Sequence, residues 1–521
     1  MIEPDGPDIE PVALSVTTGS SVISGGLWRA AASVIPPLLV LVQSVVAARA
    51  LGIQGMGRQS FIAWSSLSLT LVFTGGLPTA LIRFVGVTAG QGRADRARDL
   101  FAWAWRIEAV GALLGAGVLV AIALTRHELR LAWMFAALTC AFSVMQTVPS
   151  AVLTGLQRFR EASVVGLTTG LAGTVALVAV LKAGGGITGM FAVESAVTAA
   201  NLLWAGVIAR AALAANPARG SRSNELRREV RSYAVVATIE VFFTLVVWRR
   251  SEFFFLNRYA DSAQIAVYSI AFSAALALQA IPAGLSSVLF PAVSTLVGAG
   301  ENERARIGVM RAMRLLLLLS IPLTAGALTL GPAAIRVLWS NAYAGAGPPL
   351  VTMVIVFPLV LLGGVAGSLL YAVGRQRLLL TATIFATVVD VGLAIELVPR
   401  MQALGAAIAN SVAQALASGI SVAVVAVLLR PMVWRGRALV GTVLASAAAG
   451  LAAALALRWL PVPAGLIAGC AAFVAVFATL AVPLRVLAPD DAAWLEHAVG
   501  ARLRGSAGRI CRLFTNATKA P

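Results

Sequence analysis

The chain has 521 residues, of which 59% are apolar and 12% are charged. Soluble domains carry about 45–50% apolar and about 25% charged residues, so the composition excludes a soluble globule, a disordered chain, a collagen and a coiled coil. Residues 30–48 and 315–335 contain no ionisable side chain, and each stretch is close to the roughly 20 residues that a helix needs to cross a bilayer. The sequence therefore predicts an all-α polytopic membrane protein.

The net charge is +18, from 40 basic and 22 acidic residues. In a membrane protein such an excess is typical of cytoplasmic loops rich in arginine, so we expect no nucleic-acid partner. With two histidines and three scattered cysteines, the chain offers neither a metal site nor a disulfide framework. We expect no cofactor.

Apolar segments separated by charged or Gly/Pro-rich breaks predict about 14 transmembrane helices, in two parallel six-helix bundles with two further helices at the C-terminal end. The predicted parts are a cytoplasmic polar tail at 1–20, an N-terminal bundle at 21–210, a basic linker at 211–231, a C-terminal bundle at 232–430, two additional helices at 431–485 and a cytoplasmic tail at 486–521 that contains a short amphipathic helix. The loops between spans are too short for a soluble catalytic or nucleotide-binding domain, so we do not expect an enzyme.

The basic residues divide unevenly between the two sets of loops. One set, together with the C-terminal tail, holds 26 of them and the alternate set holds nine. Arginine and lysine accumulate on the cytoplasmic side, so this split predicts that both termini are cytoplasmic.

An internal repeat relates the first six spans to the next six. The segment 153–160, LTGLQRFR, resembles 370–377, LYAVGRQR, and the segment 189–195, GMFAVES, resembles 405–411, GAAIANS. An even number of spans per repeat gives both halves the same orientation in the membrane. Transporters built from parallel repeats move one half against the other around a central cavity.

Several motifs in this order resemble those of a known family. They are ARALGIQGMG at 48–57, GGLPTALIRF at 75–84, RSEFFFL at 250–256 and AVYSIA at 266–271. With the repeat and the predicted spans, they resemble the polysaccharide and oligosaccharide flippases of the multidrug/oligosaccharidyl-lipid/polysaccharide exporter superfamily.

The resemblance implies a protein of the bacterial cytoplasmic (inner) membrane. It would move undecaprenyl-pyrophosphate-linked oligosaccharide, a polyprenyl-pyrophosphate-linked glycan, from the cytoplasmic to the outer leaflet for cell-surface polysaccharide synthesis. It also implies membrane lipids, polysaccharide glycosyltransferases and a polymerase as partners. In such flippases cavity arginines meet the pyrophosphate, and cations or the membrane potential drive the cycle.

Arginines inside the spans are the candidates for binding the pyrophosphate, because a guanidinium forms paired charge-assisted bonds to phosphate oxygens. Arg29 lies about 12 Å into the first span at the helical rise of about 1.5 Å per residue, and Arg83 lies near the cytoplasmic end of the second. The alternative for both is an interfacial arginine whose side chain reaches the headgroups. Pro36 and Pro37 follow Arg29 and predict a hinge.

In the seventh span, Arg249 and Glu252 stand three residues apart and form a predicted structural pair. Arg250 points about 100° away from Arg249 and is predicted to face the substrate. An interfacial cluster is the alternative for all three residues.

Acids within spans are candidates for ion coupling. Glu240 has no basic residue within one helical turn, and Asp390 lies in a later span; both are predicted coupling residues. For Glu240 the alternative is a pair with Arg29 or Arg106 across helices. Arg106 is otherwise expected to pair with Glu108 or another acid.

Three other functions compete with the flippase. A cation-coupled multidrug exporter of the same superfamily would have an acidic or aromatic cavity, whereas the flippase would have a cavity lined by arginine. A membrane-embedded glycosyltransferase or polysaccharide polymerase would need a large outer loop or an acidic first loop, and residues 49–58 contain no acid. A structural relative that has lost transport is the fourth possibility.

Overall fold

The computed structural model describes residues 19–91, 93–126, 128–214, 224–248, 251–298, 301–373, 375–430, 436–487 and 490–491. Side chains are described from residue 34 onward, except in 281–298 and at single positions beside loops. Within these ranges the chain forms fifteen α-helices, one short 3-10 helix and no strand. The predicted all-α fold is therefore confirmed. The tails beyond residues 19 and 491, with most of the predicted amphipathic helix, lie outside the described residues.

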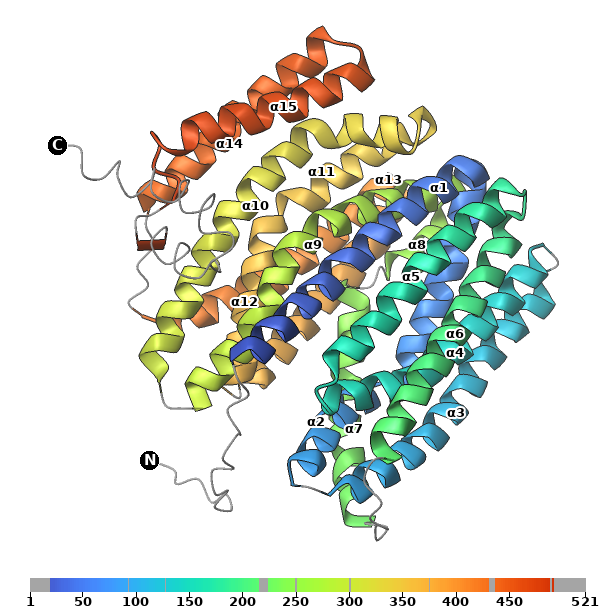
Figure 1. The fold of residues 1–521 in the computed structure, drawn as a ribbon. Helices are drawn as coiled ribbons and strands as arrows, with labels where there is room; N and C mark the ends of the chain where they lie inside the picture. The colour runs from blue at the N-terminus through green and yellow to red at the C-terminus, as the bar shows by residue number, and fades with distance from the viewer. Residues whose placement is uncertain are drawn as a thin grey trace.

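The first half of the chain contains six helices, which Figure 1 shows in blue to green. They are α1 (Gly19–Thr74), α2 (Leu77–Gly90), α3 (Ala94–Thr125), α4 (Arg130–Gly155), α5 (Phe159–Lys182) and α6 (Gly186–Ala214). Helix α1 departs from helical geometry at Gly52, where φ is 68°. A positive φ is readily adopted by glycine, and the chain turns back there, so α1 consists of two arms that run in opposite directions (Figure 1).

The second half repeats much of this plan and adds two helices. Its elements are α7 (Asn224–Trp248), α8 (Glu252–Tyr259), α9 (Ser262–Gly298), α10 (Asn302–Leu338), the 3-10 helix η1 (Asn341–Ala346), α11 (Gly347–Ile355), α12 (Phe357–Ala372), α13 (Gln376–Leu428), α14 (Gly436–Trp459) and α15 (Val462–Ala481). Helix α13 is divided at Gln402, with φ at 49°. The pair α14 and α15 packs on α10 at the outside of this half (Figure 1).

The span count agrees with the sequence. Among the described residues, eleven helices are long and apolar enough to cross a membrane, and the segments Asn341–Ile355 and Phe357–Tyr371 form one more candidate with a bend of 44°. Two of the eleven, α1 and α13, each contain two arms. When α1 and α13 are each counted as two spans and the bent pair as one, the total is fourteen, the predicted number.

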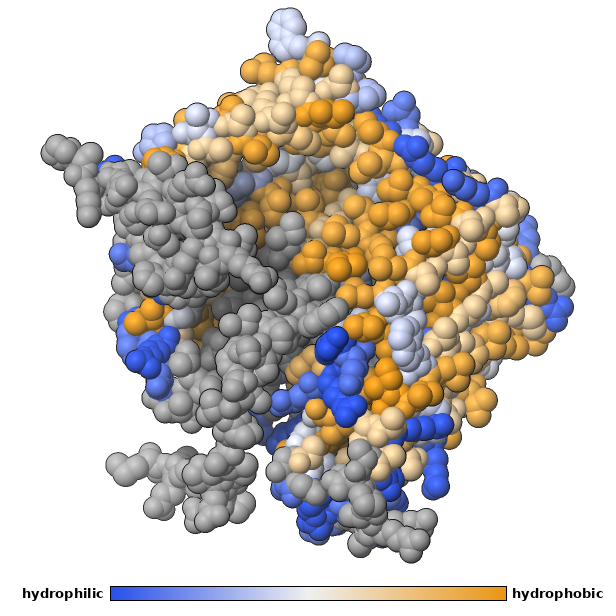
Figure 2. All heavy atoms as spheres, in the orientation of Figure 1, coloured by the Kyte–Doolittle hydropathy of each residue, from blue (hydrophilic) through white to orange (hydrophobic). Residues whose placement is uncertain are grey.

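The surface divides into an apolar middle and polar ends, as a membrane protein requires. In Figure 2 the middle is largely hydrophobic and hydrophilic residues gather toward the helix ends. We call the end that holds the turn of α1 the Gly52 end. The opposite end carries the arginine-rich turns around Arg93, Arg158 and Arg304, and we call it the basic end.

Apolar packing joins the two halves near the Gly52 end. One buried cluster combines Ala47 and Met56 of α1 with Tyr268, Ile335 and Trp339 from the second half. Other clusters lie within the first half, around Trp133 and Phe191, or within the second half, around Met313 and Leu369. The shared cluster therefore holds the halves together on one side of the molecule and closes the space between them there.

Candidate functional site: the central cavity

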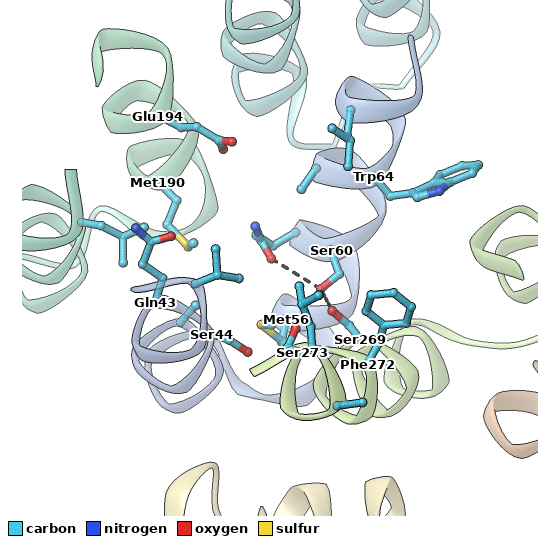
Figure 3. A pocket seen from close by; sticks show the side chains of 18 of the residues that line it. Gln43, Ser44, Met56, Ser60, Trp64, Met190, Glu194, Ser269, Phe272 and Ser273 are labelled. Carbon is cyan, nitrogen blue, oxygen red and sulfur yellow. Dashed lines mark hydrogen bonds between the residues drawn. The ribbon is translucent and has the colours of Figure 1, made fainter. Parts of the chain in front are cut away.

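A cavity of about 480 Å³ lies between the two halves. Both arms of α1 line it together with α5 and α6 from the first half and α7, α9, α11 and α13 from the second. Figure 3 shows Glu194 and Met190 on α6 facing Gln43 and the two arms of α1 across this space. The position fits a carrier whose halves move around a central site.

A seam of hydrogen bonds closes the halves together at the Gly52 end. The Trp339 indole Nε1 donates to Ser44 Oγ over 3.1 Å, and the Tyr343 hydroxyl donates to the Ala48 carbonyl over 2.7 Å. Arg49 donates to the carbonyls of Val337 and Leu338 at the end of α10, at 2.6 and 2.7 Å. These carbonyls belong to the last turn of the helix, where the helix dipole attracts a cation.

The second arm of α1 also contacts α9 in this seam, through one side-chain hydrogen bond and one close backbone contact. The Ser60 hydroxyl donates to Ser269 Oγ over 3.0 Å, a contact drawn in Figure 3. One turn closer to Gly52, a Cβ placed on Gly57 would lie 1.7 Å from the Ser262 carbonyl oxygen. Only glycine permits this approach, so the described conformation is sealed at the Gly52 end.

The described lining of the cavity is polar but almost uncharged. It contains amides, hydroxyls and aromatic rings from both halves: Gln43, Gln59, Gln279, Asn410, Gln414, Ser44, Ser60, Ser269, Ser273, Ser411, Trp64, Trp248 and Phe272. Glu194 is the only charged residue among the described lining, and its carboxylate, exposed to the cavity, has no partner among the described residues. The expected arginine lining is not found among the side chains that the structure describes.

The predicted arginines lie in different places. Position 29 belongs to the first arm of α1, but its side chain lies outside the described residues, as do Arg249 and Arg250 altogether. Arg83 is exposed on α2, with its guanidinium 5.0 Å from the centre of the Tyr233 ring and 5.7 Å from that of Phe84. It stacks between α2 and α7 and is not part of the described cavity lining.

A buried polar cluster stands beside the cavity in the second half. Glu252 on α8 has 0% exposure; its Oε2 accepts from the Tyr268 hydroxyl at 2.8 Å and its Oε1 accepts from Asn410 Nδ2 at 2.9 Å. Asn410 also donates to the Val247 carbonyl at 3.0 Å and accepts from Gln414 Nε2 at 2.8 Å. The predicted pair of Glu252 with Arg249 stays a prediction, because Arg249 lies outside the described residues.

Asp390, a predicted coupling residue, adjoins this cluster. Its Oδ2 accepts from the Ser251 hydroxyl at 3.3 Å, and its Oδ1 is buried without a hydrogen-bond partner among the described residues. Asp390 is 0% exposed. The helix break between α7 and α8 thus brings two buried carboxyl groups, those of Glu252 and Asp390, close together although they are far apart in the sequence.

The other predicted groups are separate from the cavity. Glu240 is half-buried on α7 and has no partner among the described residues. Glu108 on α3 is 1% exposed with both carboxylate oxygens unpartnered, while Arg106 is exposed. The expected pairing of Arg106 with Glu108 is therefore absent, because residues two apart do not face each other on a helix.

The helix continues through the predicted hinge. Pro36 and Pro37 lie inside α1, whose backbone leaves helical geometry at Gly52. A hinge at the two prolines stays a prediction.

Sequence reasoning missed the cavity positions of Glu194 and Asn410. They are equivalent residues in the internal repeat, since GMFAVES at 189–195 aligns with GAAIANS at 405–411. Both line the cavity, one from each half. The alignment of the repeat contained this signal, because equivalent positions of a parallel repeat face the same central space.

Two helical halves around a central cavity are typical of membrane carriers, and the comparisons with known proteins are more specific. The model of the polysaccharide biosynthesis protein family matches residues 22–297, more than half of the chain. The model of the lipid II flippase MurJ matches residues 253–481. The chain belongs to the polysaccharide biosynthesis protein family, within the flippases of the MOP superfamily, as the sequence motifs predicted.

Solved structures share the fold. An inward-closed lipid II flippase MurJ has a TM-score of 0.66 at 13% identity, covering 88% of this chain and 99% of its own. An inward-facing multidrug resistance MATE family transporter has a TM-score of 0.63 at 13% identity, covering 78% and 98%. A MOP superfamily transporter from Pyrococcus furiosus, whose binding pocket is described as of reverse polarity, has a TM-score of 0.52 at 13% identity, covering 77% and 98%. No curated protein matches the sequence.

Proposed function

We propose that this flippase translocates undecaprenyl-pyrophosphate-linked oligosaccharide from the cytoplasmic to the outer leaflet of the bacterial inner membrane by alternating access. The observation that carries the proposal is the match of more than half of the chain to the polysaccharide biosynthesis protein family. The described lining of the cavity, which is polar and rich in amides and hydroxyls, is compatible with a glycan head group. The proposed organisation is two six-span halves at 21–210 and 232–430, with the linker 211–231, two added helices at 431–485 and both termini in the cytoplasm.

The lining suits the sugars of such a substrate. Glutamine and asparagine amides each donate and accept hydrogen bonds, as do serine hydroxyls, and sugar hydroxyls need both. Trp64, Trp248 and Phe272 offer apolar ring surface to the faces of the sugar rings. The isoprenoid chain stays in the lipid, so the cavity has to hold only the polar head.

We propose that arginines outside the described lining hold the pyrophosphate. Position 29 precedes Val40, which lines the cavity, by eleven residues, about three helical turns or roughly 16 Å. It therefore occupies the same face of an ideal helix, on the basic side of the cavity. Arg29 and Arg250 are the proposed ligands, and Arg83 is the proposed contact at the entrance. Pro36 and Pro37 are the proposed hinge between the pyrophosphate and the sugars.

We propose that the cluster around Asp390 and Glu252 couples transport to a proton or a monovalent cation. Two neighbouring buried carboxylates repel each other when both are ionised, and the described residues around them supply hydroxyls and an amide but no cationic side chain. In this proposal a bound proton or cation, together with Arg249, the predicted partner of Glu252, balances the charge. Glu240 on α7 is a second proposed coupling position. Glycosyltransferases and a polymerase are the proposed partner enzymes.

The test is translocation of a fluorescent polyprenyl-pyrophosphate-linked sugar in proteoliposomes. We expect Arg29→Ala to lower the rate by about tenfold or more, since a hydrogen bond to a charged group contributes about 1.5–3 kcal/mol. We expect Gln43→Ala to lower it by about two- to tenfold, since a neutral hydrogen bond contributes about 0.5–1.5 kcal/mol. Gln91→Ala is the matched control, because Gln91 is exposed at the end of α2, and we expect it to leave the rate unchanged. Wild-type protein that fails to move any pyrophosphate-linked sugar would contradict the proposal.

A second candidate, the cation-coupled multidrug exporter, has one observation in its favour. Glu194 places a negative charge in the cavity beside aromatic rings, the combination that attracts an organic cation. In the same liposomes, tetraphenylphosphonium transport that is lost in Glu194→Gln would support this candidate. Transport of the lipid-linked sugar without transport of the cation would eliminate it.

A further inference from the structure

A second cavity, of about 470 Å³, opens at the Gly52 end beside the seam between the halves. We call it the Gly52-end pocket. Its walls include the charged residues Arg58, Arg126 and Glu128, the indole of Trp133, and the polar residues Asn257 and Ser262. None of these residues lines the central cavity, so the pocket is a separate site.

The two walls of the pocket belong to different halves. Arg58 comes from the second arm of α1, Arg126 and Glu128 from the turn between α3 and α4, and Trp133 from the next turn of α4. Asn257 and Ser262 come from the other half. Because Gly57 meets the Ser262 backbone directly, the pocket straddles the contact that has to separate when the Gly52 end opens.

The charges of the described lining do not cancel. Arg58 Nη1 and Glu128 Oε2 form an ion pair at 3.0 Å, with side-chain exposures of 49% and 80%. Arg126 has no carboxylate partner among the described residues; His127, which adjoins it, lies outside them. The described lining therefore holds two arginines and one carboxylate. An ion pair this exposed contributes little, so an incoming anion can displace Glu128 from Arg58.

We propose that the Gly52-end pocket binds a phosphate ester at the level of the lipid headgroups. Arginine binds phosphate through paired charge-assisted hydrogen bonds, and the indole N–H of Trp133 supplies a further donor. The ends of transmembrane helices lie at the headgroup region. Two sources share this chemistry: the pyrophosphate of the translocated lipid, in which case the inference rests on the proposed function, and a resident anionic phospholipid.

The location gives the site a role in the cycle. A phosphate held by Arg58 and Arg126 lies against the wall that Asn257 and Ser262 form in the sealed state. When the halves separate at the Gly52 end, that wall withdraws and the arginine wall faces the outside. The pocket is thus placed to receive an anionic headgroup on the side where the substrate leaves.

The test is equilibrium binding of radiolabelled inorganic pyrophosphate to purified full-length protein that carries Arg29→Ala and Arg250→Ala, so that the proposed central ligands do not contribute. In this background we expect Arg126→Ala to weaken binding by about tenfold and Glu128→Gln to strengthen it by about threefold. Arg130→Ala is the matched control, because Arg130 is exposed at the start of α4 and does not line the pocket. We expect it to change binding by less than about twofold.

Two further arms identify the source of the phosphate. Competition by polyprenyl diphosphate but not by phosphatidylglycerol assigns the site to the translocated lipid, and the reverse assigns it to a resident phospholipid; both results support a phosphate-ester site. Equal binding by the Arg126→Ala and Arg130→Ala proteins, or no pyrophosphate binding in the background protein, overturns the inference. Loss of sugar translocation with this binding intact would count against the proposed function alone.

Discussion

The two halves of the repeat have different side chains at equivalent positions that line the cavity. Glu194 and Asn410 are equivalent in the repeat and both line the central space. Glu194 presents a free carboxylate to the cavity, whereas Asn410 is 2% exposed and holds Glu252 inside a hydrogen-bonded cluster. The position is the same in the two halves of the repeat but its role differs: Glu194 of the first half faces the contents of the cavity, whereas Asn410 of the second half belongs to the buried cluster around Glu252 and Asp390.

This difference suggests that the two halves have different roles in transport. A buried network of carboxyl groups and amides has few satisfied arrangements, because each unpaired member costs free energy in a low-dielectric interior. Adding or removing one proton or cation therefore favours a different arrangement of α8, α9 and α13. An exposed side chain in a cavity imposes no such constraint. This argument supports our proposal that the coupling site is in the second half.

The first prediction concerns Gly57→Ala, at the seam between the halves. In Gly57→Ala the added Cβ would lie 1.7 Å from the Ser262 carbonyl oxygen, so the sealed state cannot form without displacement. Overpacking costs about 1–3 kcal/mol, and about 1.4 kcal/mol corresponds to tenfold in an equilibrium. We expect the population open at the Gly52 end to rise by about tenfold or more.

The measurement is the rate at which a membrane-impermeant thiol reagent, added on the side of the Gly52 end, labels Ala63→Cys in protein whose native cysteines are replaced. Ala63 lines the cavity. Gly117→Ala is the control, because nothing lies within 4 Å of a Cβ added there. Identical labelling of the two glycine variants would show that the seam at Gly57 does not close the cavity.

The second prediction compares an asparagine from each half. Asn410→Ala removes donors from Glu252 and from the Val247 carbonyl, and each buried group left unpaired costs about 1–3 kcal/mol, more for a charged one. Asn201→Ala removes neutral bonds, one from Gln146 and one to Thr169, each 2.9 Å long, worth about 0.5–1.5 kcal/mol each. We expect the free energy of unfolding to fall by roughly 3 kcal/mol for Asn410→Ala and by about half of that for Asn201→Ala.

Unfolding in a denaturant series, followed by intrinsic fluorescence in the same detergent, gives both values. If the two substitutions destabilised the protein equally, the second-half cluster would be no more than a set of ordinary hydrogen bonds. The buried carboxyl group of Glu252, which sets Asn410 apart from Asn201, would then make no additional contribution to stability.

The sequence predicted the features that depend on local spacing. The spans follow from the length of the apolar segments, and the repeat follows from the matching segments of the two halves. The stacking of Arg83 on Tyr233, the isolation of Glu108 and the meeting of Asp390 with Ser251 beside Glu252 do not follow from either. They depend on which helices pack together, and residues more than a hundred positions apart have no spacing that can be read from one chain.

The third prediction concerns the exposed acid of the first half, and its expected effect on stability is small. Because the Glu194 carboxylate faces the cavity and has no described partner, Glu194→Gln breaks no described hydrogen bond and should change the free energy of unfolding by less than about 1 kcal/mol. Asp390→Asn, at a side chain that is 0% exposed, should change it by more, in the same denaturant series. A loss above about 1 kcal/mol in Glu194→Gln would mean that the carboxylate is held by a partner in solution, and the division between an exposed acid in one half and a buried network in the other would no longer stand.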